Sequence, residues 1–437
     1  MDARALTSRL QSFDPAVRSG QITRVTSTYV EANGPDAPIG ALCSIESSNK
    51  GQIDVPATVV AIQSGRIVLA PYESLDGARL GSVVRLVARK STVGVGDGLL
   101  GRAIDGLGRP IDDLGTVRCD QIGTAGTQTT TPLDRVTPNT ILTTGLRAID
   151  GLLTLARGQR IGVFAAPGVG KTTLLTQLAR QVLADRCVLC LVGERGREVE
   201  ATWNTALDAP ARERCVMVAA TSDQSAAMRI QAVEQALAIS EAWRAQGLHV
   251  LLLIDSVTRY AMALREIGLA AGEPPTVRAY TPGVFAALPR LVERCGALRS
   301  GGAITAVMTV LSETDDVDDP ISEMMKSLLD GHIILSRALA EQGRHPAIDI
   351  PRSISRLAHG LRSPPHRQVA EKALGLIASY EMSRTLIDAG VYTAGANAET
   401  DAAIRQRPAL EAFLRQADGT HSTFDATLNA LRHAGGV

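Results

Sequence analysis

The chain has 437 residues, more than one hydrophobic core usually supports, so we expect two or three domains. Lysine plus arginine and aspartate plus glutamate both total 45, and aromatic residues make up only 3%, which argues against a basic, base-stacking surface for nucleic acid. The start, MDARALTSRLQSFD, lacks the apolar core of a signal peptide, and no run approaches the roughly 18 apolar residues of a membrane span. We therefore expect a soluble, cytoplasmic protein with no nucleic-acid partner.

Between about Gly20 and Ala88, short runs rich in Val, Ile and Thr alternate with turns of Gly, Asn, Pro and Ser. The runs are TRVTSTYV, TVVAI and RIVLAPY. Short strands at such close spacing are typical of a small all-β barrel or sandwich. We predict an N-terminal β-barrel domain over residues 1–90.

A Gly-rich passage, VGVGDGLLGRAIDGLGRPIDDLG, leads to a segment in which strand and helix patterns alternate from about Arg160. The strand candidates are RIGVFA, CVLCLVGE, HVLLLIDS and AITAVMTVL, with helical spacing from Leu174 to Leu183 and a long helix over 225–246. This alternation predicts an α/β domain over 91–363, whose parallel sheet has right-handed crossovers and binds ligands at the carboxyl ends of its strands. Beyond Ser363 only helical periodicity remains, which predicts a helical domain over 364–437.

The stretch FAAPGVGKTTLL has the features of a phosphate-binding loop that opens a helix. Such a loop needs backbone N–H groups turned toward the anion, a cation for the terminal phosphates and a hydroxyl for a magnesium ion. Gly168 and Gly170 give the backbone the conformational freedom that the loop needs. Lys171 carries the charge, and Thr172 carries the hydroxyl. Ala165 occupies the position of the first glycine in the usual pattern. A turn tolerates alanine there when its φ is negative. Gly-Lys-Thr also fits an ordinary turn, but the flanking strand and helix favour nucleotide binding. The expected contacts are Ala166, Pro167, Gly168, Val169, Gly170, Lys171, Thr172 and Thr173.

Two carboxylates are expected at the same edge of the sheet. LLLID delivers Asp255 to the end of a strand, where it could hold magnesium, usually through water, or cap the following helix. The phosphate loop favours the magnesium role. Glu194 in LVGERGREVE could activate the attacking water, but its spacing fits a surface ion pair with Arg195 or Arg197 equally well.

Other conspicuous residues carry less chemistry on their own. The acidic run SETDDVDDPIS lacks the spacing and glycine of a calcium loop, so a solvated loop is expected. Cys187 and Cys190 stand three apart on a strand and face opposite ways, which excludes a shared metal or redox site. Arg356 in PRSISRLAHG is one of 45 basic residues, and spacing alone predicts that it is a surface arginine.

Over nearly its whole length the chain resembles the ATPases of bacterial type III secretion and flagellar export, which are relatives of the rotary ATP synthase catalytic subunit. The resemblance is carried by LLGRAIDGLGRPID, GVGKTTLL, GERGREVE, LLLIDSVTRYAMALREIG, HPAIDIPRSISR and VYTAGANAETDAAIRQRPALEAFLRQ. The export ATPases resemble this chain in having Ala at the position of Ala165, and GERGREV points the same way. The resemblance implies a RecA-like nucleotide-binding domain between the barrel and the helical domain.

By the same resemblance, Lys171 contacts phosphate, Thr172 and Asp255 hold Mg²⁺, Glu194 is the catalytic glutamate that polarises water, and Arg195 lies near the terminal phosphate of ATP. Two further positions have implied roles. Arg356 matches the arginine finger that reaches a neighbour's nucleotide. His345 stands where the family has a tyrosine against adenine, and it offers less apolar area for stacking.

The implied assembly is a homohexameric ring, and the implied activity is Mg²⁺-dependent hydrolysis of ATP that drives protein export. Expected partners are stalk and stator proteins, the export gate and chaperone–substrate complexes, which would hold the chain at the cytoplasmic face of the inner membrane. The acidic run would face the central pore. ATP hydrolysis would aid chaperone release, unfolding and export of substrates by a flagellar or an injectisome system, and the sequence does not separate the two.

Three alternatives compete with this interpretation. A rotary ATP synthase or ion-pump subunit is disfavoured by Ala165, GERGREV and His345. A ring translocase on RNA is disfavoured by the neutral, aromatic-poor composition. A homologue that binds nucleotide without hydrolysis is disfavoured because Lys171, Glu194 and Asp255 are all present.

Overall fold

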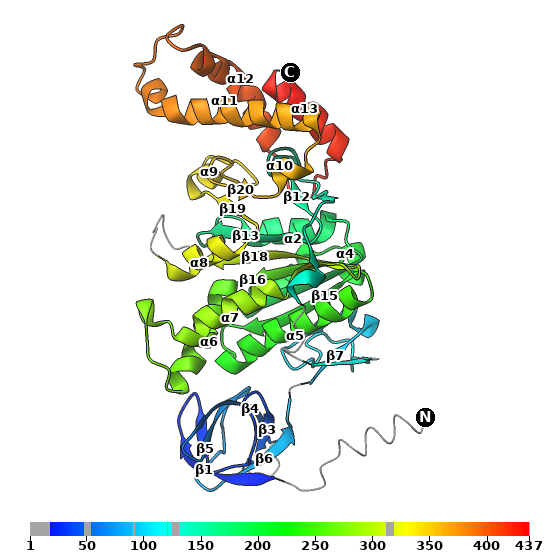
Figure 1. The fold of residues 1–437 in the computed structure, drawn as a ribbon, viewed down its shortest axis with the longest axis vertical. Helices are drawn as coiled ribbons and strands as arrows, with labels where there is room; N and C mark the ends of the chain where they lie inside the picture. Colours follow the sequence, from blue (N-terminus) through cyan, green and yellow to red (C-terminus); the bar gives the residue numbers. More distant parts are fainter. Residues whose placement is uncertain are drawn as a thin grey trace.

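The computed structural model describes residues 18–47, 54–90, 92–119, 121–124, 131–311 and 319–436. Figure 1 shows three parts in succession along the long axis: a β-barrel, a sheet flanked by helices, and a group of helices at the C-terminal end. The central part carries most of the described chain. The predicted fold class, a barrel followed by a parallel-sheet domain and then helices, is confirmed.

The first part is a closed antiparallel barrel of order β1-β2-β5-β4-β3-β6. Its strands are β1 (Ser19–Val25), β2 (Val30–Ala32), β3 (Leu42–Ile45), β4 (Val55–Gln63), β5 (Arg66–Pro71) and β6 (Val83–Ala88). Val55, Ala57 and Val59 are buried and alternate with half-buried neighbours, as a strand with one face in a barrel interior requires. Closure leaves no unpaired sheet edge in the barrel.

The central sheet has the order β20-β19-β13-β18-β16-β14-β15-β8, with the strands from β19 to β8 parallel and β20 antiparallel. Its strands are β8 (Ala103–Ile104), β13 (Arg160–Ala165), β14 (Arg186–Glu194), β15 (Cys215–Thr221), β16 (His249–Asp255), β18 (Ala303–Leu311), β19 (Gly331–Leu335) and β20 (Ile354–Ser355). Smaller strands are β7 (Thr92–Val95), β9 (Gln121–Thr124), β10 (Arg135–Val136), β11 (Ile141–Leu142), β12 (Leu155–Ala156) and β17 (Gly296–Leu298). The predicted parallel sheet is confirmed, with the ends of β13, β16 and β14 at one edge.

Helices cover both faces of this sheet. They are α2 (Lys171–Gln181), α3 (Gly196–Ala201), α4 (Ala209–Glu213), α5 (Ala226–Ala245), α6 (Val257–Ala270), α7 (Pro282–Glu293), α8 (Pro320–Leu328), α9 (Arg337–Glu341) and α10 (Ala358–Leu361). Short irregular helical turns are η1 (Asp97–Leu99), η2 (Pro132–Asp134), η3 (Ala148–Leu153), η4 (Thr202–Ala206) and η5 (Val277–Ala279). The long helix expected over 225–246 is α5, and Ser225 caps it by accepting the N–H of Met228.

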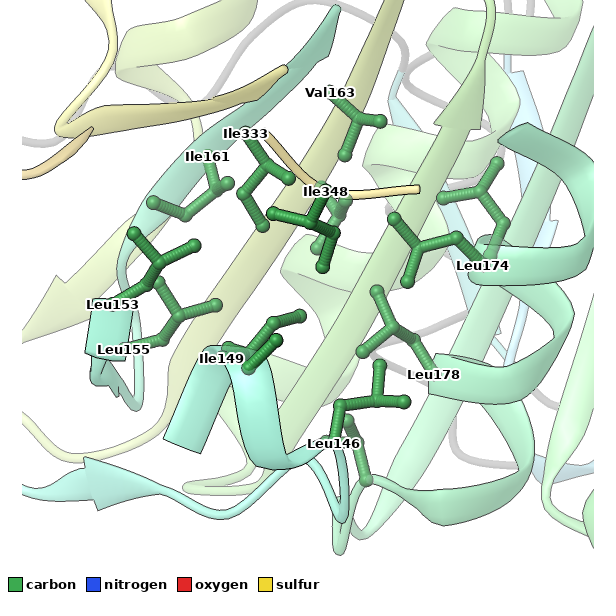
Figure 2. Packing of buried hydrophobic residues seen from close by; sticks show 14 of the residues in the cluster. Leu146, Ile149, Leu153, Leu155, Ile161, Val163, Leu174, Leu178, Ile333 and Ile348 are labelled. Carbon is green, nitrogen blue, oxygen red and sulfur yellow. The ribbon is translucent and has the colours of Figure 1, made fainter. Parts of the chain in front are cut away.

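The alternation of side chains along β16 divides the interior into two cores. Leu251 and Leu253 face a core that includes α2 and the C-terminal helices, whereas Leu252 faces a core built with α5, α6 and α7. Figure 2 shows the first of these cores, where Leu174 and Leu178 of α2 pack among residues from η3, β13 and β19. Burial of one such leucine contributes about 2 kcal/mol, so this packing fixes α2 against the sheet.

The helix after the phosphate loop is shorter than its periodicity suggests. The sequence pattern extends to Leu183, but α2 ends at Gln181 and Leu183 is 80% exposed. The guanidinium of Arg214 donates to the carbonyl oxygens of Ala179, Arg180 and Val182 at 2.7–2.8 Å. Arg214, which directly precedes β15, therefore binds the carbonyl oxygens that would accept hydrogen bonds from a further turn of α2.

The C-terminal part consists of α11 (Pro364–Asp388), α12 (Ala398–Leu414) and α13 (Phe424–Gly435), as the loss of strand signals beyond Ser363 predicts. Asn397 caps α12 by accepting two backbone N–H groups, and Thr423 caps α13 by accepting the N–H of Ala426. Crossing a bilayer takes a longer unbroken apolar helix than any that occurs among the described residues.

Candidate nucleotide-hydrolysis site

The phosphate loop connects β13 to α2 and leaves the start of the helix open. Gly168 has φ 81° and Gly170 has φ 96°, a left-handed conformation that favours glycine. Ala165 is the last residue of β13 and does not share this conformation, so its methyl group is tolerated, as the sequence predicts. No side chain caps the N-terminus of α2, whose N–H groups are therefore free to bind an anion.

Lys171 begins α2 and meets both predicted carboxylates. Its Nζ forms an ion pair with Oδ1 of Asp255 and lies 3.3 Å from Oε1 of Glu194. The three residues are far apart in sequence, but β16 pairs directly with β14, so Asp255 and Glu194 end neighbouring strands. Glu194 thus pairs with Lys171 at the sheet edge, whereas Arg195 forms its ion pair with Glu198.

Asp255 has one satisfied and one unsatisfied oxygen. The hydroxyl of Thr309 donates to Oδ1 at 2.7 Å, whereas buried Oδ2 has no hydrogen-bond partner among the described residues. Thr172 is exposed on the first turn of α2 and lines the cavity at the phosphate loop, whereas Asp255 is buried and does not line it. A carboxylate oxygen and a hydroxyl are ligands that Mg²⁺ accepts, so these residues fit the ion that the sequence predicts.

The carboxyl group of Glu194 is more basic than an ordinary glutamate. Burial raises its pKa, the nearby Lys171 ammonium opposes that rise, and the charge of Asp255 adds to it. Its side chain is 19% exposed, so water still reaches it. A partly buried carboxylate with a raised pKa suits the role of a base that accepts a proton from water.

Gly193, the residue before Glu194, lets the side chain of Arg259 pack closely against β14. Gly193 has φ 70° at an irregularity in the pairing of β14, and a Cβ atom there would lie 3.0 Å from Cβ and Cγ of Arg259. Arg259 is on the first turn of α6, and its buried Nε has no partner among the described residues. It therefore brings an incompletely satisfied cation beside Glu194.

These residues surround a cavity of about 520 Å³. The predicted residues that line it are Pro167, Gly168, Gly170, Lys171, Thr172, Thr173, Glu194 and Arg195. Of the other predicted loop contacts, Ala166 and Val169 do not line it, and Val169 is buried in the first core. The other residues that line the cavity were not predicted from the sequence: Gly193, Glu198, Ser222, Arg259 and Leu311. For Arg259 a signal existed, because it follows Asp255 by four residues and so returns to the same edge after one helical turn.

Similar proteins of known family agree with this geometry. Residues 145–355 match the nucleotide-binding domain of the ATP synthase alpha/beta family, and residues 362–433 match the C-terminal domain of the EscN ATPase of type III secretion systems. The flagellum-specific ATP synthase of Bacillus subtilis (strain 168) is 41% identical over 433 residues, which cover 99% of this chain and 98% of that protein. The chain belongs to the flagellar and type III secretion ATPase family.

Relatives from both branches of this export ATPase family are similarly close. The type 3 secretion system ATPase of Sinorhizobium fredii (strain NBRC 101917 / NGR234) is 41% identical over 97% of this chain and 94% of its own. Among solved structures, the assembled ATPase EscN of enteropathogenic E. coli has a TM-score of 0.90 at 41% identity, covering 95% of this chain and all of that one. EscN in complex with its central stalk EscO has a TM-score of 0.87 at 40% identity, with the same coverage. The resemblance inferred from the motifs is confirmed.

In this export ATPase, Arg356 lies away from the cavity of its own chain. It follows β20 at the edge of the sheet, and β19, β13 and β18 stand between β20 and the strands that carry Asp255 and Glu194. The exposed guanidinium donates to the carbonyl of Lys326 at 3.0 Å. Arg356 therefore does not line the site formed by Lys171 and Glu194.

Arg195 and His345 occupy different surroundings. The side chain of Arg195 is 70% exposed, lines the cavity and pairs with Glu198 at 3.3 Å. His345 is exposed and does not line the cavity, and its carbonyl accepts the N–H of Gln416 at 2.8 Å. The structure thus brings Arg195 to the predicted phosphate site and leaves His345 outside it.

Most of the acidic run, residues 312–318, falls outside the described residues, so its predicted place at a pore stays a prediction. Its last aspartate, Asp319, caps α8 by accepting the N–H and hydroxyl of Ser322 at 3.0 and 2.7 Å. Cys187 and Cys190 are buried in β14, on opposite faces of the sheet.

Proposed function

We propose that this chain is the ATP-hydrolysing motor of a bacterial type III protein export apparatus, of the flagellar or the injectisome kind, and that its turnover depends on Mg²⁺. The observation that carries the proposal is the contact of Lys171 with both Glu194 and Asp255 at the open start of α2, beside a cavity that Lys171 and Glu194 line. Membership in the export ATPase family supports the reaction, ATP and water to ADP and phosphate.

Thr172 and Asp255 would hold the Mg²⁺ ion. The unsatisfied Oδ2 of Asp255 supports this assignment, because a buried carboxylate oxygen without a partner is costly. When bound, the ion would neutralise phosphate charge and make the terminal phosphorus more open to attack. Lys171, the loop N–H groups of Gly168 and Gly170, and the loop residues Ala166, Pro167, Val169 and Thr173 would hold the nucleotide.

Glu194 would accept the proton of the attacking water at its carboxylate. Lys171, Arg195 and Arg259 surround the place where the terminal phosphate would lie, and their positive charge would stabilise the charge that develops on its oxygens. Positioning and electrostatic stabilisation account for most catalysis of phosphoryl transfer, so no covalent step by the chain is needed.

A homohexameric ring would complete each site. Arg356 supports this proposal because it is exposed at the sheet edge and lies apart from its own chain's cavity, as a residue that serves a neighbour must. The assembled structure of EscN supports the ring, and its complex with EscO supports a stalk partner. We extend the proposal to stator proteins, the export gate and chaperone–substrate complexes. These partners would hold the chain at the cytoplasmic face of the inner membrane. ATP hydrolysis would act on the chaperone–substrate complexes, from which substrates are released and unfolded.

His345 is the proposed adenine contact, since the resemblance aligns it with the adenine-stacking tyrosine of the family. The proposed domains are residues 1–90, 91–363 and 364–437. Each of these assignments depends on ATP lying along the phosphate loop: the Mg²⁺ ligands, the arginine finger Arg356 and the adenine contact His345.

The test compares Glu194→Gln with Glu200→Gln, a matched change at an exposed glutamate of α3 that does not line the cavity. Phosphate release by the first variant should fall about 10²-fold or more, while its binding of Mg-ATP is retained. The second variant should match the wild type. Equal phosphate release by Glu194→Gln and wild type would refute the hydrolytic role. Stable co-purification with a second, non-catalytic homologue would instead indicate a rotary ATP synthase or ion-pump subunit.

A further inference from the structure

A second cavity lies between the barrel and the central domain, apart from the hydrolysis site. It has a volume of about 420 Å³, and none of its lining residues also lines the hydrolysis cavity. The barrel side contributes Thr58, Tyr72 and Arg89, and the central domain contributes α5, α6 and α7. A volume of this size suits a small molecule rather than a folded partner.

Three cations surround this cavity without a described counter-ion. Arg89 and Lys90 follow β6, and Arg290 is on the last turn of α7. All three are exposed, and no ion pair or hydrogen bond of their side chains occurs among the described residues. They therefore leave a local excess of positive charge at the place where the two domains meet.

Of the other charged residues that line the cavity, Glu234 and Arg294 carry opposite charges and pair with each other. Arg294 donates two hydrogen bonds to Glu241, at 2.8 and 2.9 Å, and a third to Glu234 at 2.6 Å. Glu234 is the carboxylate that lines the cavity, and its charge is thus already paired. The uncompensated charge of the cavity is positive.

The interior also offers a hydrogen-bond donor. Tyr260, on the first turn of α6, lines the cavity and is 3% exposed, and its hydroxyl has no hydrogen-bond partner among the described residues. Burial raises the pKa of Tyr260, so the hydroxyl keeps its proton and can donate. The hydroxyl of this buried residue is therefore available to donate to a ligand oxygen in the cavity.

We propose that this cavity binds a small phosphate-bearing anion, held by Arg89, Lys90 and Arg290 and by a hydrogen bond from Tyr260. Arginine presents a planar fork that matches a phosphate, and lysine adds a compact charge. Because the walls come from two domains, the ligand would hold the barrel against α7. Tyr260 also follows Asp255 by five residues, so the ligand would contact the helix that begins at the proposed Mg²⁺ site.

The test uses the full chain with its phosphate loop saturated by Mg²⁺ and a fluorescent ADP, so that displacement from the hydrolysis site is visible. Inorganic pyrophosphate and UMP are titrated separately by calorimetry. We expect a binding event that leaves the fluorescent ADP in place, and the tighter of the two probes shows whether the ligand is an inorganic phosphate or a nucleotide.

Two variants and one control make the result specific. Arg89→Gln combined with Arg290→Gln should weaken binding at least about tenfold, because two charge-assisted contacts are lost. Tyr260→Phe should weaken it about fivefold. Arg79→Gln, at an exposed barrel arginine that does not line the cavity, should bind as the wild type does. Absence of a binding event, displacement of the fluorescent ADP, or equal binding by the double variant and Arg79→Gln would overturn the proposal, and ATP turnover by each variant verifies its fold.

Discussion

The hydroxyl of Thr309 donates a 2.7 Å hydrogen bond to Oδ1 of Asp255, across the paired strands β18 and β16. This bond fixes the carboxylate so that Oδ2, which has no partner among the described residues, remains available. Thr309 is fully buried and does not line the hydrolysis cavity. It is therefore a positioning residue for the proposed Mg²⁺ ligand.

Thr309→Val should raise the Mg²⁺ concentration for half-maximal ATP hydrolysis about tenfold. A hydrogen bond to a charged group is worth about 1.5–3 kcal/mol, and its loss leaves Asp255 free to turn. Thr309→Ser retains the hydroxyl and should restore the wild-type value. If Thr309→Val changes kcat at saturating Mg²⁺ but not the half-saturating concentration, the positioning role is wrong.

The raised pKa of Glu194 predicts an acidic limb in the pH profile of hydrolysis. The base must be ionised to accept a proton, so kcat should rise with pH through a pKa above the ordinary glutamate value of about 4.3. Steady-state turnover measured across this range checks the limb. The residual turnover of Glu194→Gln should lack it, and a limb that persists in this variant would assign the titration to another group.

The same shift has a consequence for stability with a definite sign. Glu194 binds a proton more readily in the folded chain than in the unfolded chain, so its contribution to stability is present at low pH and is lost as pH rises from the ordinary value to the raised pKa. Urea unfolding of wild type and Glu194→Gln over this window should show the wild type losing free energy of unfolding relative to the variant. A difference that grows in the opposite direction would contradict the raised pKa.

Arg259→Ala should lower kcat/KM for ATP about 10²-fold, since a cation beside Glu194 would no longer face the developing phosphate charge. Arg197→Ala is the matched control, because Arg197 is exposed on the neighbouring α3 and does not line the cavity. Comparable losses in the two variants would show that general surface charge, and not the position of Arg259, sets the rate.

Arg356→Ala should reduce turnover by the assembled protein about 10³-fold and leave nucleotide binding by single chains intact. The strongest check is a mixture of Arg356→Ala chains with Glu194→Gln chains. A ring that joins the two variants contains interfaces at which an intact Arg356 meets an intact Glu194, so mixing should restore hydrolysis that neither variant shows alone. No recovery in verified mixed rings would place Arg356 outside the neighbour's site. Arg337→Ala, at an exposed arginine of α9, should behave as wild type.

Arg214→Ala should lower the free energy of unfolding by about 1–3 kcal/mol, because three carbonyl oxygens at the end of α2 lose their donor. Urea denaturation measures the change. Arg214→Lys should recover only part of it, since one ammonium does not span all three carbonyls. Full stability in Arg214→Ala would show that solvent satisfies these groups.

The sequence by itself determined the elements and the chemistry of the phosphate loop. Alternation of side chains specified the strands of the barrel, helical periodicity specified α5, and Gly168, Gly170, Lys171 and Thr172 marked the loop, because each of these signals depends on local geometry along the chain. The motifs that follow it were sufficient to indicate the export ATPase family. The end of α2 was misplaced, because a residue more than 30 positions away, Arg214, terminates that helix.

Only the tertiary structure decided which side chains meet. The sheet order β13-β18-β16-β14 differs from the order along the chain, so spacing did not show that Lys171 contacts both Asp255 and Glu194. The pairing of Glu194 with Lys171 and its partial burial are tertiary features, and the raised pKa follows from that burial. Arg259 and the cationic cavity at the barrel likewise depend on contacts between segments that are distant in sequence, which local pattern does not encode.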